Sequence, residues 1–317
     1  MIWQQLPKPF FVLAPMEDVT DTVFRQIINS CGRPDVSFTE FTNVDGFFSV
    51  GRHQVAQRLV FTPGEKPLIA QIWGLTPENY FKAAKKLGEM GFDGIDINMG
   101  CPQPAVIKKG ACSALINNHT LAAEIIQATK EGSGGLPVSV KTRLGFKTNQ
   151  REEWIDFLLS QDISALTIHG RTAAQMSAVP ANWEEIGNVV EMRNKKEVKT
   201  LIIGNGDVMS LSEAKEKVAT YGVDGVMIGR GVFHNPWLFN EQVDIETVSL
   251  EKRLQLLLSH TKLYVETWKD EKPFQVLKKY FKIYVNGFAN ASDLRAQLMT
   301  TTSLEEVYKI VDPLLSK

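Results

Sequence analysis

The chain of 317 residues has little cysteine, almost no net charge and no long apolar segment. Its three cysteines, Cys31, Cys101 and Cys112, are too few and too odd in number for a disulfide framework. Neither a signal peptide pattern nor an apolar run of about 18 residues occurs, so no transmembrane helix is expected. These absences predict a protein of the reducing cytoplasm that does not enter a membrane.

Common metal and nucleotide motifs are absent as well. Cys101, Cys112, His119 and His169 lack the C-x-x-C or H-x-x-x-H spacing of metal ligands, so no metal site is expected. The sequence also lacks G-x-x-x-x-G-K-[ST] and a strand-linked G-x-G-x-x-G, which argues against a nucleoside triphosphate or a tightly held Rossmann dinucleotide. The formal net charge of -1 does not exclude nucleic acid, because a local basic face is enough for phosphate contacts.

Eight short β-rich apolar runs alternate with amphipathic segments, a pattern typical of βα units and a parallel sheet. The runs lie near residues 10, 36, 67, 94, 137, 165, 200 and 225. Amphipathic segments between them include residues 77–90, 120–131, 152–160, 183–194 and 212–221. Eight strands within about 230 residues predict an α/β fold, a closed (β/α)8 TIM barrel, because a doubly wound sheet usually has fewer strands.

The pattern changes after about residue 245. The segment around this position is polar and unperiodic, and the sequence beyond it is continuously helical in pattern. We therefore predict a barrel domain over residues 1–245 and a small all-helical domain over residues 246–317.

Polar or glycine-rich residues follow almost every predicted strand. Chemistry in a TIM barrel collects at the C-terminal ends of the strands. A single Asn or Gln at a strand end is more often a cap for backbone groups than a ligand, but eight such ends together predict an active face. The residues concerned are Pro15, Met16, Glu40, Gln71, Asn98, Cys101, Lys141, Arg143, His169, Arg171, Asn205, Gly206, Asp207, Gly229 and Arg230.

Glycine-rich segments follow the last two strands, at residues 204–207 and 228–231. Barrels commonly bind phosphate at these two positions, because glycines let backbone amides approach an anion, and Arg230 would add charge. The alternative is that these glycines only make tight turns. Lys141 would suit a ligand that becomes anionic, or would pair with Glu40. His169 would hold a phosphate, polarise a carbonyl or be a satisfied core histidine.

Six segments, in this order and spacing, resemble the tRNA-dihydrouridine synthases. They are LAPMEDVTD, INMGCPQPAVIKKGACSAL, VKTRLG, TIHGRT, IIGNGD and VMIGRG. Residues 278–298 also resemble that family's C-terminal helical domain. The resemblance implies flavin mononucleotide (FMN) in the barrel mouth, NADPH or NADH as its reductant, and reduction of the C5–C6 double bond of particular uridines in tRNA.

The resemblance also implies roles for individual residues around the flavin. Pro15, Met16 and Glu17 would pass beneath its ring, and Gln71 and Lys141 would contact the polar edge of the ring. His169 would lie near the cofactor, whose phosphate would be held by Asn205, Gly206, Asp207, Gly229 and Arg230. Two loop segments depart from the family pattern, around Cys112, where members commonly have a second glycine, and at residues 177–179.

Cys101 stands between Gly100 and Pro102, which predicts a turn that exposes its thiol. Reducing an isolated C5–C6 bond of uracil needs a hydride at C6 and a proton at C5 from the opposite face, and a thiol can be that acid. Asn98 is expected to hydrogen-bond the Watson–Crick edge of a uridine drawn out of the folded tRNA. Cys31 fits a small buried hydrophobe, whereas Cys112 is intermediate.

Basic side chains supply candidate tRNA contacts. Those in the helical domain are interleaved with Tyr280, Phe281 and Tyr284, which we expect in the core. Lys278 and Lys282 should share one face of a helical segment, with Lys279 alongside. The candidates are Lys108, Lys109, Arg143, Lys147, Arg151, Arg171, Lys278, Lys279, Lys282 and Arg295.

Two alternative functions follow from the same barrel. One is a small-molecule flavin reductase or pyrimidine dehydrogenase, against which the helical domain and its basic residues argue. The other is a tRNA-binding relative without catalysis, against which Cys101, Lys141 and the phosphate motifs argue. We expect a monomer whose choice of uridine depends on how the whole tRNA is oriented rather than on pocket chemistry.

Overall fold

The computed structural model describes residues 2–315, and the chain divides into two compact units. The first comprises Met1–Thr22 and Pro34–Gly229, and the second comprises Val23–Arg33 and Arg230–Lys317. This division by contacts differs from the predicted boundary near residue 245, because an early helix joins the second unit. That helix, α2 (Thr22–Cys31), stacks Phe24 on Tyr280 with ring centroids 5.2 Å apart. Sequence periodicity reports local neighbours and does not reveal such a contact.

The first unit is a closed parallel barrel, as predicted. Eight strands follow one another around it, neighbouring strands pair in parallel, and the pairing of β2 with β4 closes the ring. A two-residue strand, β3 (Thr42–Asn43), pairs with the end of β4. The barrel strands are β1 (Phe10–Leu13), β2 (Val36–Phe38), β4 (Leu68–Trp73), β5 (Gly94–Met99), β6 (Val138–Arg143), β7 (Ala165–His169), β8 (Leu201–Asn205) and β9 (Gly225–Ile228).

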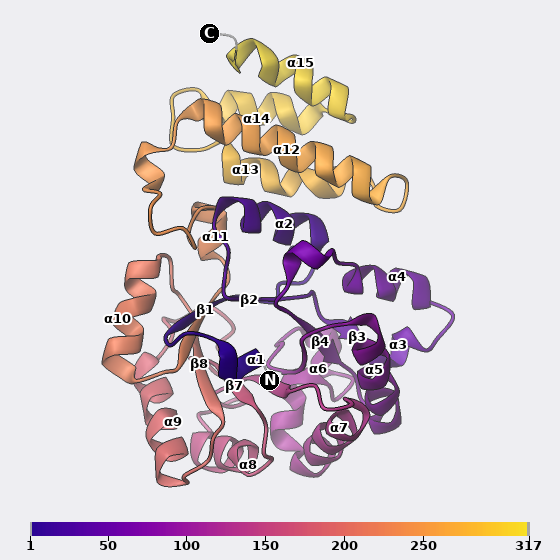
Figure 1. The fold of residues 1–317 in the computed structure, drawn as a ribbon, viewed down its shortest axis with the longest axis vertical. Coiled ribbons are helices and arrows are strands. Elements are labelled where there is room, and N and C mark those ends of the chain that lie inside the picture. Colours follow the sequence, from indigo (N-terminus) through magenta and orange to yellow (C-terminus); the bar gives the residue numbers. More distant parts are fainter. Residues whose placement is uncertain (1, 316–317) are drawn as a thin grey trace. The chain divides into compact units, whose positions relative to one another are not determined.

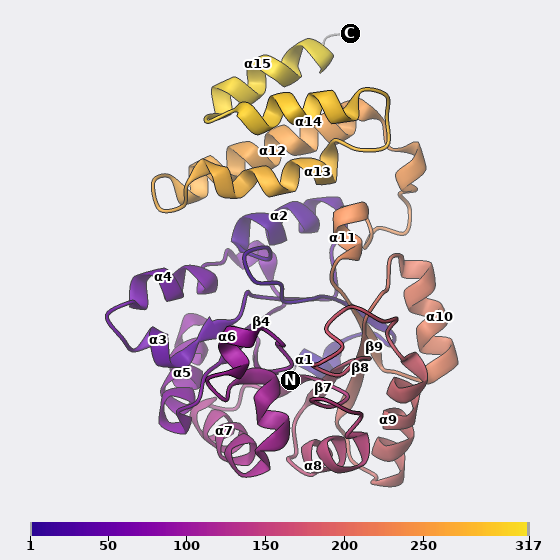
Figure 2. The ribbon, with the colours of Figure 1, turned by 180° about the vertical axis from the view of Figure 1, so that it is seen from behind.

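Helices cover the outside of the barrel (Figures 1 and 2). The predicted amphipathic segments correspond to α5 (Pro77–Met90), α7 (His119–Gly132), α8 (Asp156–Leu159) with the preceding π-turn Arg151–Ile155, α9 (Trp183–Lys195) and α10 (Leu211–Tyr221). Asn118, Asn182 and Ser210 accept hydrogen bonds at the starts of α7, α9 and α10. Shorter helices lie in the loops: α1 (Ile2–Gln5), α3 (Val44–Phe47), α4 (Arg52–Ala56), α6 (Pro104–Ile107) and the 3-10 helix η3 (Cys112–Asn117).

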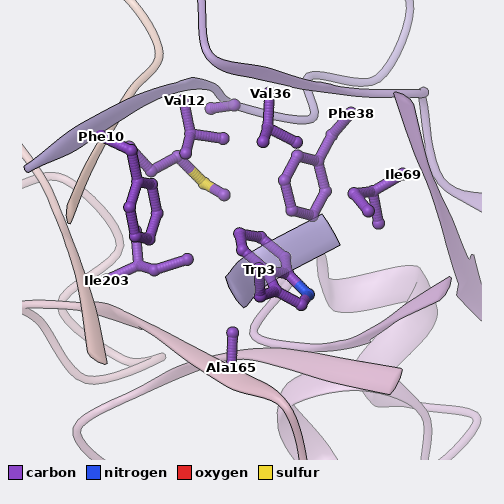
Figure 3. Packing of buried hydrophobic residues seen from close by; sticks show 10 residues of the cluster. Trp3, Phe10, Val12, Val36, Phe38, Ile69, Ala165 and Ile203 are labelled. Carbon is purple, nitrogen blue, oxygen red and sulfur yellow. The ribbon is translucent and has the colours of Figure 1, made fainter. Parts of the chain in front are cut away.

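An apolar cluster fills the barrel at the N-terminal ends of its strands. Trp3 of α1 packs there against Phe10 and Phe38, with ring centroids 5.8 and 6.4 Å away (Figure 3). Val12, Val36, Ile69, Ala165 and Ile203 complete this layer. Trp3 therefore closes the barrel interior at the N-terminal ends of the strands.

The barrel interior becomes polar toward the C-terminal ends of the strands. Side chains alternate along a strand, so Gln71, Thr167 and Asn205 lie on the same inner face as Ile69, Ala165 and Ile203, two residues earlier. Strand register then sets polar residues side by side: Asp96 with Ser139, Asn98 with Lys141, Arg143 with His169, and His169 with Asn205. The barrel interior is thus apolar at the N-terminal ends of the strands and polar at their C-terminal ends.

The second unit is helical, as predicted for the C-terminal residues. Besides α2 and α11 (Gly231–His234), it contains α12 (Leu250–Trp268), η6 (Phe274–Tyr280), α13 (Phe281–Tyr284), α14 (Ala291–Thr300) and α15 (Leu304–Leu315). Tyr280, Phe281 and Tyr284 are buried, which confirms them as core. Within residues 2–315, none of the helices has both the length and the apolar character needed to cross a membrane.

One detail of the helical prediction was wrong. The segment that carries Lys278, Lys279 and Lys282 is not one α-helix, because the 3-10 helix η6 ends at Tyr280 and the short α13 begins at Phe281. The Nζ atom of Lys278 donates a 2.8 Å hydrogen bond to the carbonyl oxygen of Met299. Lys278 therefore has a structural contact. Lys279 and Lys282 are exposed, and the Nζ atom of Lys279 lies 5.1 Å from the centroid of the Tyr280 ring.

Candidate active site

Cys101 lies on the turn that follows β5, and its thiol is partly exposed. The side-chain oxygen of Asn98 accepts hydrogen bonds from the backbone nitrogens of Gly100, at 3.0 Å, and Cys101, at 2.9 Å. On the other side, the Ser113 hydroxyl donates to the carbonyl oxygen of Cys101 at 2.9 Å. The turn is therefore held from both sides, which orients the thiol at the barrel mouth.

Asn98 acts in the structure as a cap for backbone groups, one of the two readings of a strand-end amide. Its oxygen is used by the turn, and its nitrogen donates to Gln71 Oε1 at 3.0 Å. An amide nitrogen carries two hydrogens, so one N–H of Asn98 remains for a substrate. The predicted contact of Asn98 with the base stays a prediction, limited to that single donor.

Asp96 is a buried site residue that the sequence analysis missed. Its two carboxylate oxygens accept hydrogen bonds from Ser139 Oγ at 2.6 Å and Gln71 Nε2 at 2.7 Å. Through Gln71 and Asn98, these bonds form a continuous chain from Asp96 to the Cys101 turn. Burial raises the pKa of Asp96 to about 6, against the opposing effect of Ser139 and Gln71. A charged residue inside an apolar strand pattern was the available signal.

Lys141 lies half-buried at the barrel mouth, and its Nζ donates to the side-chain oxygen of Asn205 at 3.0 Å. Burial, together with Arg143, lowers the pKa of Lys141 to about 8, while Asp96 and Cys101 oppose that shift. The group is thus a cation at pH 7, stabilised by Asp96. The predicted alternative, an ion pair between Lys141 and Glu40, is not formed within residues 2–315, where the lysine contacts Asn205 instead.

His169, Arg171 and Asp207 form a connected cluster after β7 and β8. The Arg171 guanidinium donates to His169 Nε2 at 2.9 Å, to the carbonyl oxygen of Val179 at 2.5 Å, and to the Asp207 carboxylate. Because arginine only donates, His169 Nε2 must be the acceptor, so the ring proton of the neutral form lies on Nδ1. Arg171 is buried and holds this cluster, so its predicted contact with tRNA stays untested.

The turn after β8 requires glycine at one position. Gly206 has φ 128°, and a Cβ there would lie 2.6 Å from Cβ of Ala181. The Asp207 carboxylate is taken by Arg171 and by the backbone nitrogen of Ala181 at 2.9 Å, so only its backbone is suited to an anion. Gly229 ends the first unit, and Arg230, the next residue, belongs to the second.

The segment after β1 carries the remaining predicted cofactor residues. Pro15, Met16 and Glu17 are partly exposed, and Thr20 Oγ1 accepts a 2.9 Å hydrogen bond from the Met16 nitrogen. Glu17 forms an ion pair with Arg58, and burial raises the pKa of Glu17 against that pairing. This segment is therefore held in place by contacts of its own.

The predicted tRNA-binding residues differ widely in exposure. Lys108, Lys109 and Lys147 are exposed, whereas Arg143 is buried and donates to the carbonyl oxygens of Gly100, Thr172 and Met176 at 2.8 to 3.0 Å. Arg151 pairs with Glu152 and Glu185. In the second unit, Arg295 donates to the carbonyl oxygen of Val285 at 2.7 Å. Contact of these residues with tRNA stays a prediction. The buried Arg143 also holds the loops whose carbonyl oxygens it contacts.

A cavity of about 830 Å³ opens at the other end of the barrel. Its lining includes Trp3, Val138, Ser164 and Leu201, at the N-terminal ends of β6, β7 and β8. The polar part of the barrel interior lies at the C-terminal ends, where TIM barrels carry their chemistry, so we place the active site there. Among residues 2–315, no group of three His, Cys, Asp or Glu side chains is arranged to hold a metal ion.

The parallel barrel with a thiol and a cation at its C-terminal mouth defines a TIM-barrel enzyme. Residues 12–316 match the dihydrouridine synthase (Dus) family, and the chain belongs to this family. A probable tRNA-dihydrouridine synthase 2 of Bacillus subtilis (strain 168) is 48% identical over 313 residues, covering 98% of this chain and 95% of the relative. A probable tRNA-dihydrouridine synthase of Staphylococcus aureus (strain MRSA252) is also 48% identical, covering 98% and 94%.

Solved structures share the fold at low sequence identity. The morphinone reductase structure aligns with TM-score 0.51 and 15% identity over 75% of this chain and 87% of that chain. A 2-naphthoyl-CoA reductase aligns with TM-score 0.58 and 12% identity over 76% and 51%. At these identities the likeness supports the TIM-barrel architecture alone.

Proposed function

We propose that this chain is a tRNA-dihydrouridine synthase that reduces the C5–C6 double bond of uridines in tRNA, with Cys101 as the acid. The main observation behind this proposal is the position of Cys101. Its thiol is partly exposed at the barrel mouth, and its backbone is hydrogen-bonded to Asn98 and Ser113. The family match and the two relatives named above support the reaction. They cover the helical residues as well as the barrel, which disfavours a reductase of small molecules.

The residues at the mouth fit FMN. Lys141 offers a cation, Gln71 offers an amide, and the Gly206 turn offers backbone without a side chain. At Gly229, a Cβ would make only ordinary contacts, at 3.6 Å, with Ala14 and Met16, so no close contact within the protein requires glycine at this position. Arg230, Asn205 and Asp207 complete the proposed phosphate site, with Asp207 acting through its backbone. When bound, FMN reduced by NADPH or NADH supplies the hydride to C6.

The protein's own residues supply the proton. The S–H bond of Cys101 breaks, a C–H bond forms at C5 of the uracil, and the resulting thiolate later takes a proton from water. The pKa of Cys101 is lowered to about 7, first by a hydrogen bond from Cys112 and further by the Gln103 backbone and Arg143. This lowering makes the thiol a stronger acid than ordinary cysteine and stabilises the thiolate left behind.

Exposed lysines would bind the tRNA backbone in this proposal. Lys108, Lys109 and Lys147 lie on loops of the barrel unit, and Lys279 and Lys282 on the helical unit. Phosphate contacts of this kind are independent of base sequence. The proposal includes action as a monomer in the cytoplasm, and the position of the uridine depends on the whole tRNA.

The direct test uses unmodified tRNA transcripts, purified protein and NADPH. Formation of dihydrouridine, detected by mass spectrometry of the digested RNA, is the expected result. Reduction of free uridine at the same rate would instead favour a small-molecule reductase. Absence of dihydrouridine with a mixture of many tRNAs would overturn the proposal.

A further inference from the structure

Cys112 has a backbone conformation that cysteine seldom adopts. Its φ is 54°, it is buried, and it begins the 3-10 helix η3. Residues with a Cβ are disfavoured in this left-handed region, which glycine enters freely. A thiol held in such a conformation points to a use for the sulfur that glycine would not serve.

The Cys112 side chain lies close enough to the Cys101 thiol to act on it as a hydrogen-bonding neighbour, which lowers the pKa of Cys101. The next residue, Ser113, donates to the Cys101 carbonyl oxygen twice, from its hydroxyl at 2.9 Å and from its backbone nitrogen at 3.4 Å. Two consecutive residues of η3 therefore contact the sulfur and the carbonyl of Cys101, while Asn98 contacts its nitrogen. Every polar atom of Cys101 has a partner in this arrangement.

The direction of the thiol–thiol hydrogen bond follows from the surroundings. Burial raises the pKa of Cys112 well above its ordinary value, so this thiol keeps its proton. Cys101 is the more acidic thiol of the two. Cys112 S–H is therefore the donor, and the sulfur of Cys101 is the acceptor.

Other titratable groups also face the two thiols. Arg143 favours the Cys101 thiolate and Glu17 opposes it, while Lys141 lies close enough for Cys101 to raise the pKa of the lysine. Tyr80 faces Cys112, and burial raises the pKa of Tyr80 well above its ordinary value, so it is neutral. Replacing Cys112 removes a hydrogen bond to Cys101 without changing any of these charges.

We propose that Cys112 is a positioning residue that holds the Cys101 sulfur at the barrel mouth and stabilises its thiolate after proton transfer. The inference rests on the proposed function in one respect, namely that the proton of Cys101 goes to C5 of the uracil. The contact between the thiols can be tested without tRNA or a reductant. It predicts that removal of the Cys112 thiol makes Cys101 less acidic and less reactive at neutral pH.

The experiment measures alkylation of Cys101 by iodoacetamide from pH 5 to 10 in the purified protein, with the modified peptide identified by mass spectrometry. In Cys112→Gly, the midpoint of the pH profile should rise by about one unit or more, and the rate at pH 7 should fall at least about threefold. Cys112→Ser should lie between the two, because its hydroxyl also donates. The pH profile of dihydrouridine formation should move in the same direction.

Glycine suits the backbone at residue 112, so the Cys112→Gly protein should fold, and Cys112→Ala provides the same readout if it does not. An unchanged midpoint in the Gly or Ala variant would overturn the inference and leave Cys112 as a packing residue. Failure of the parent protein to form dihydrouridine would instead contradict the proposed function, and the alkylation result would be unaffected.

Discussion

The side-chain oxygen of Asn98 and the backbone nitrogen of Cys101 are joined by a 2.9 Å hydrogen bond. This bond ties the last inward-facing polar residue of β5 to the turn that carries the thiol. The same oxygen accepts a second bond from Gly100 at 3.0 Å. The orientation of the thiol therefore depends on an amide that the strand itself holds in place.

Replacing Asn98 by alanine should release this turn. We expect Asn98→Ala to slow uridine reduction by roughly 10- to 100-fold, because a small misplacement of a reacting group is enough for such losses. Flavin content should stay near that of the parent. Single-turnover reduction of tRNA by pre-reduced enzyme measures the effect.

Asn118→Ala is the matched control for Asn98→Ala. Asn118 makes the same kind of bond, to the Leu121 nitrogen at 3.1 Å, but at the start of α7. Its loss should lower the free energy of unfolding by about 1 kcal/mol without slowing reduction. A rate for Asn98→Ala within twofold of the parent would contradict the role of this turn.

Cys101 should control both the rate and its pH dependence. We expect Cys101→Ala to slow uridine reduction by about 10²-fold or more while NADPH oxidation without tRNA continues. In the parent, the single-turnover rate should decline as pH rises above about 7, because the acid must be protonated and the pKa of Cys101 is about 7. Cys31→Ala, at a buried cysteine of the second unit, serves as the control and should retain the parent rate. Parent-like reduction by Cys101→Ala would refute the assignment.

The bound cofactor should be FMN, visible as oxidised-flavin absorbance of the purified protein. Gly229→Ala should weaken FMN binding about tenfold, because the added Cβ meets only ordinary contacts within the protein but would meet a ligand above the turn. Titration of the apoprotein with FMN measures this change. Gly88→Ala, inside α5 and also free of close contacts, should bind FMN as the parent does. Recovery of flavin adenine dinucleotide, or equal affinity in both variants, would count against the site.

Asp96 should keep Lys141 protonated. In Asp96→Asn the carboxylate is lost, so the pKa of Lys141 should fall below its present value of about 8. Activity and flavin retention should then decline at pH 7.5 to 8 relative to pH 6 by more than in the parent. The control is Asp224→Asn, which removes a carboxylate paired with Lys8 and Arg193 at the opposite end of the barrel. A pH profile in Asp96→Asn that matches the parent would show that Lys141 does not depend on Asp96.

Lys279 and Lys282 should act through phosphate contacts. Alanine at either position should weaken tRNA binding whatever the sequence and reduce the salt-dependence slope by about 0.7–0.9. Lys262→Ala, an exposed lysine of the same unit that pairs with Glu266, should leave the slope unchanged. Lys278→Ala should lower the melting temperature as well, because the contact with Met299 is lost. Equal slopes for all these proteins would move the tRNA footprint to the loops around Lys108 and Lys147.

The barrel could be predicted from the sequence alone, and so could the end of the barrel at which we place the active site. The eight strands, the helices between them and the turn at Cys101 follow from periodicity and from Gly100 and Pro102, which act locally. The C-terminal ends of parallel strands lie at one end of the barrel, so the sequence predicts Lys141, His169 and Asn205 on the same face. Burial of Tyr280, Phe281 and Tyr284 followed from helical pattern in the same way.

Which group each polar side chain contacts could be learned from the three-dimensional structure alone. In the sequence, Asp96 is simply one residue of a predicted strand. The strand register of the structure places it beside Ser139 and Gln71. The sequence suggests that Arg143 and Arg171 are exposed cations. In the structure they are buried and donate hydrogen bonds to carbonyl oxygens of other loops. Cys112 meets Cys101 because η3 folds back onto the β5 turn. Such contacts depend on strand register and loop packing, which local sequence pattern does not encode.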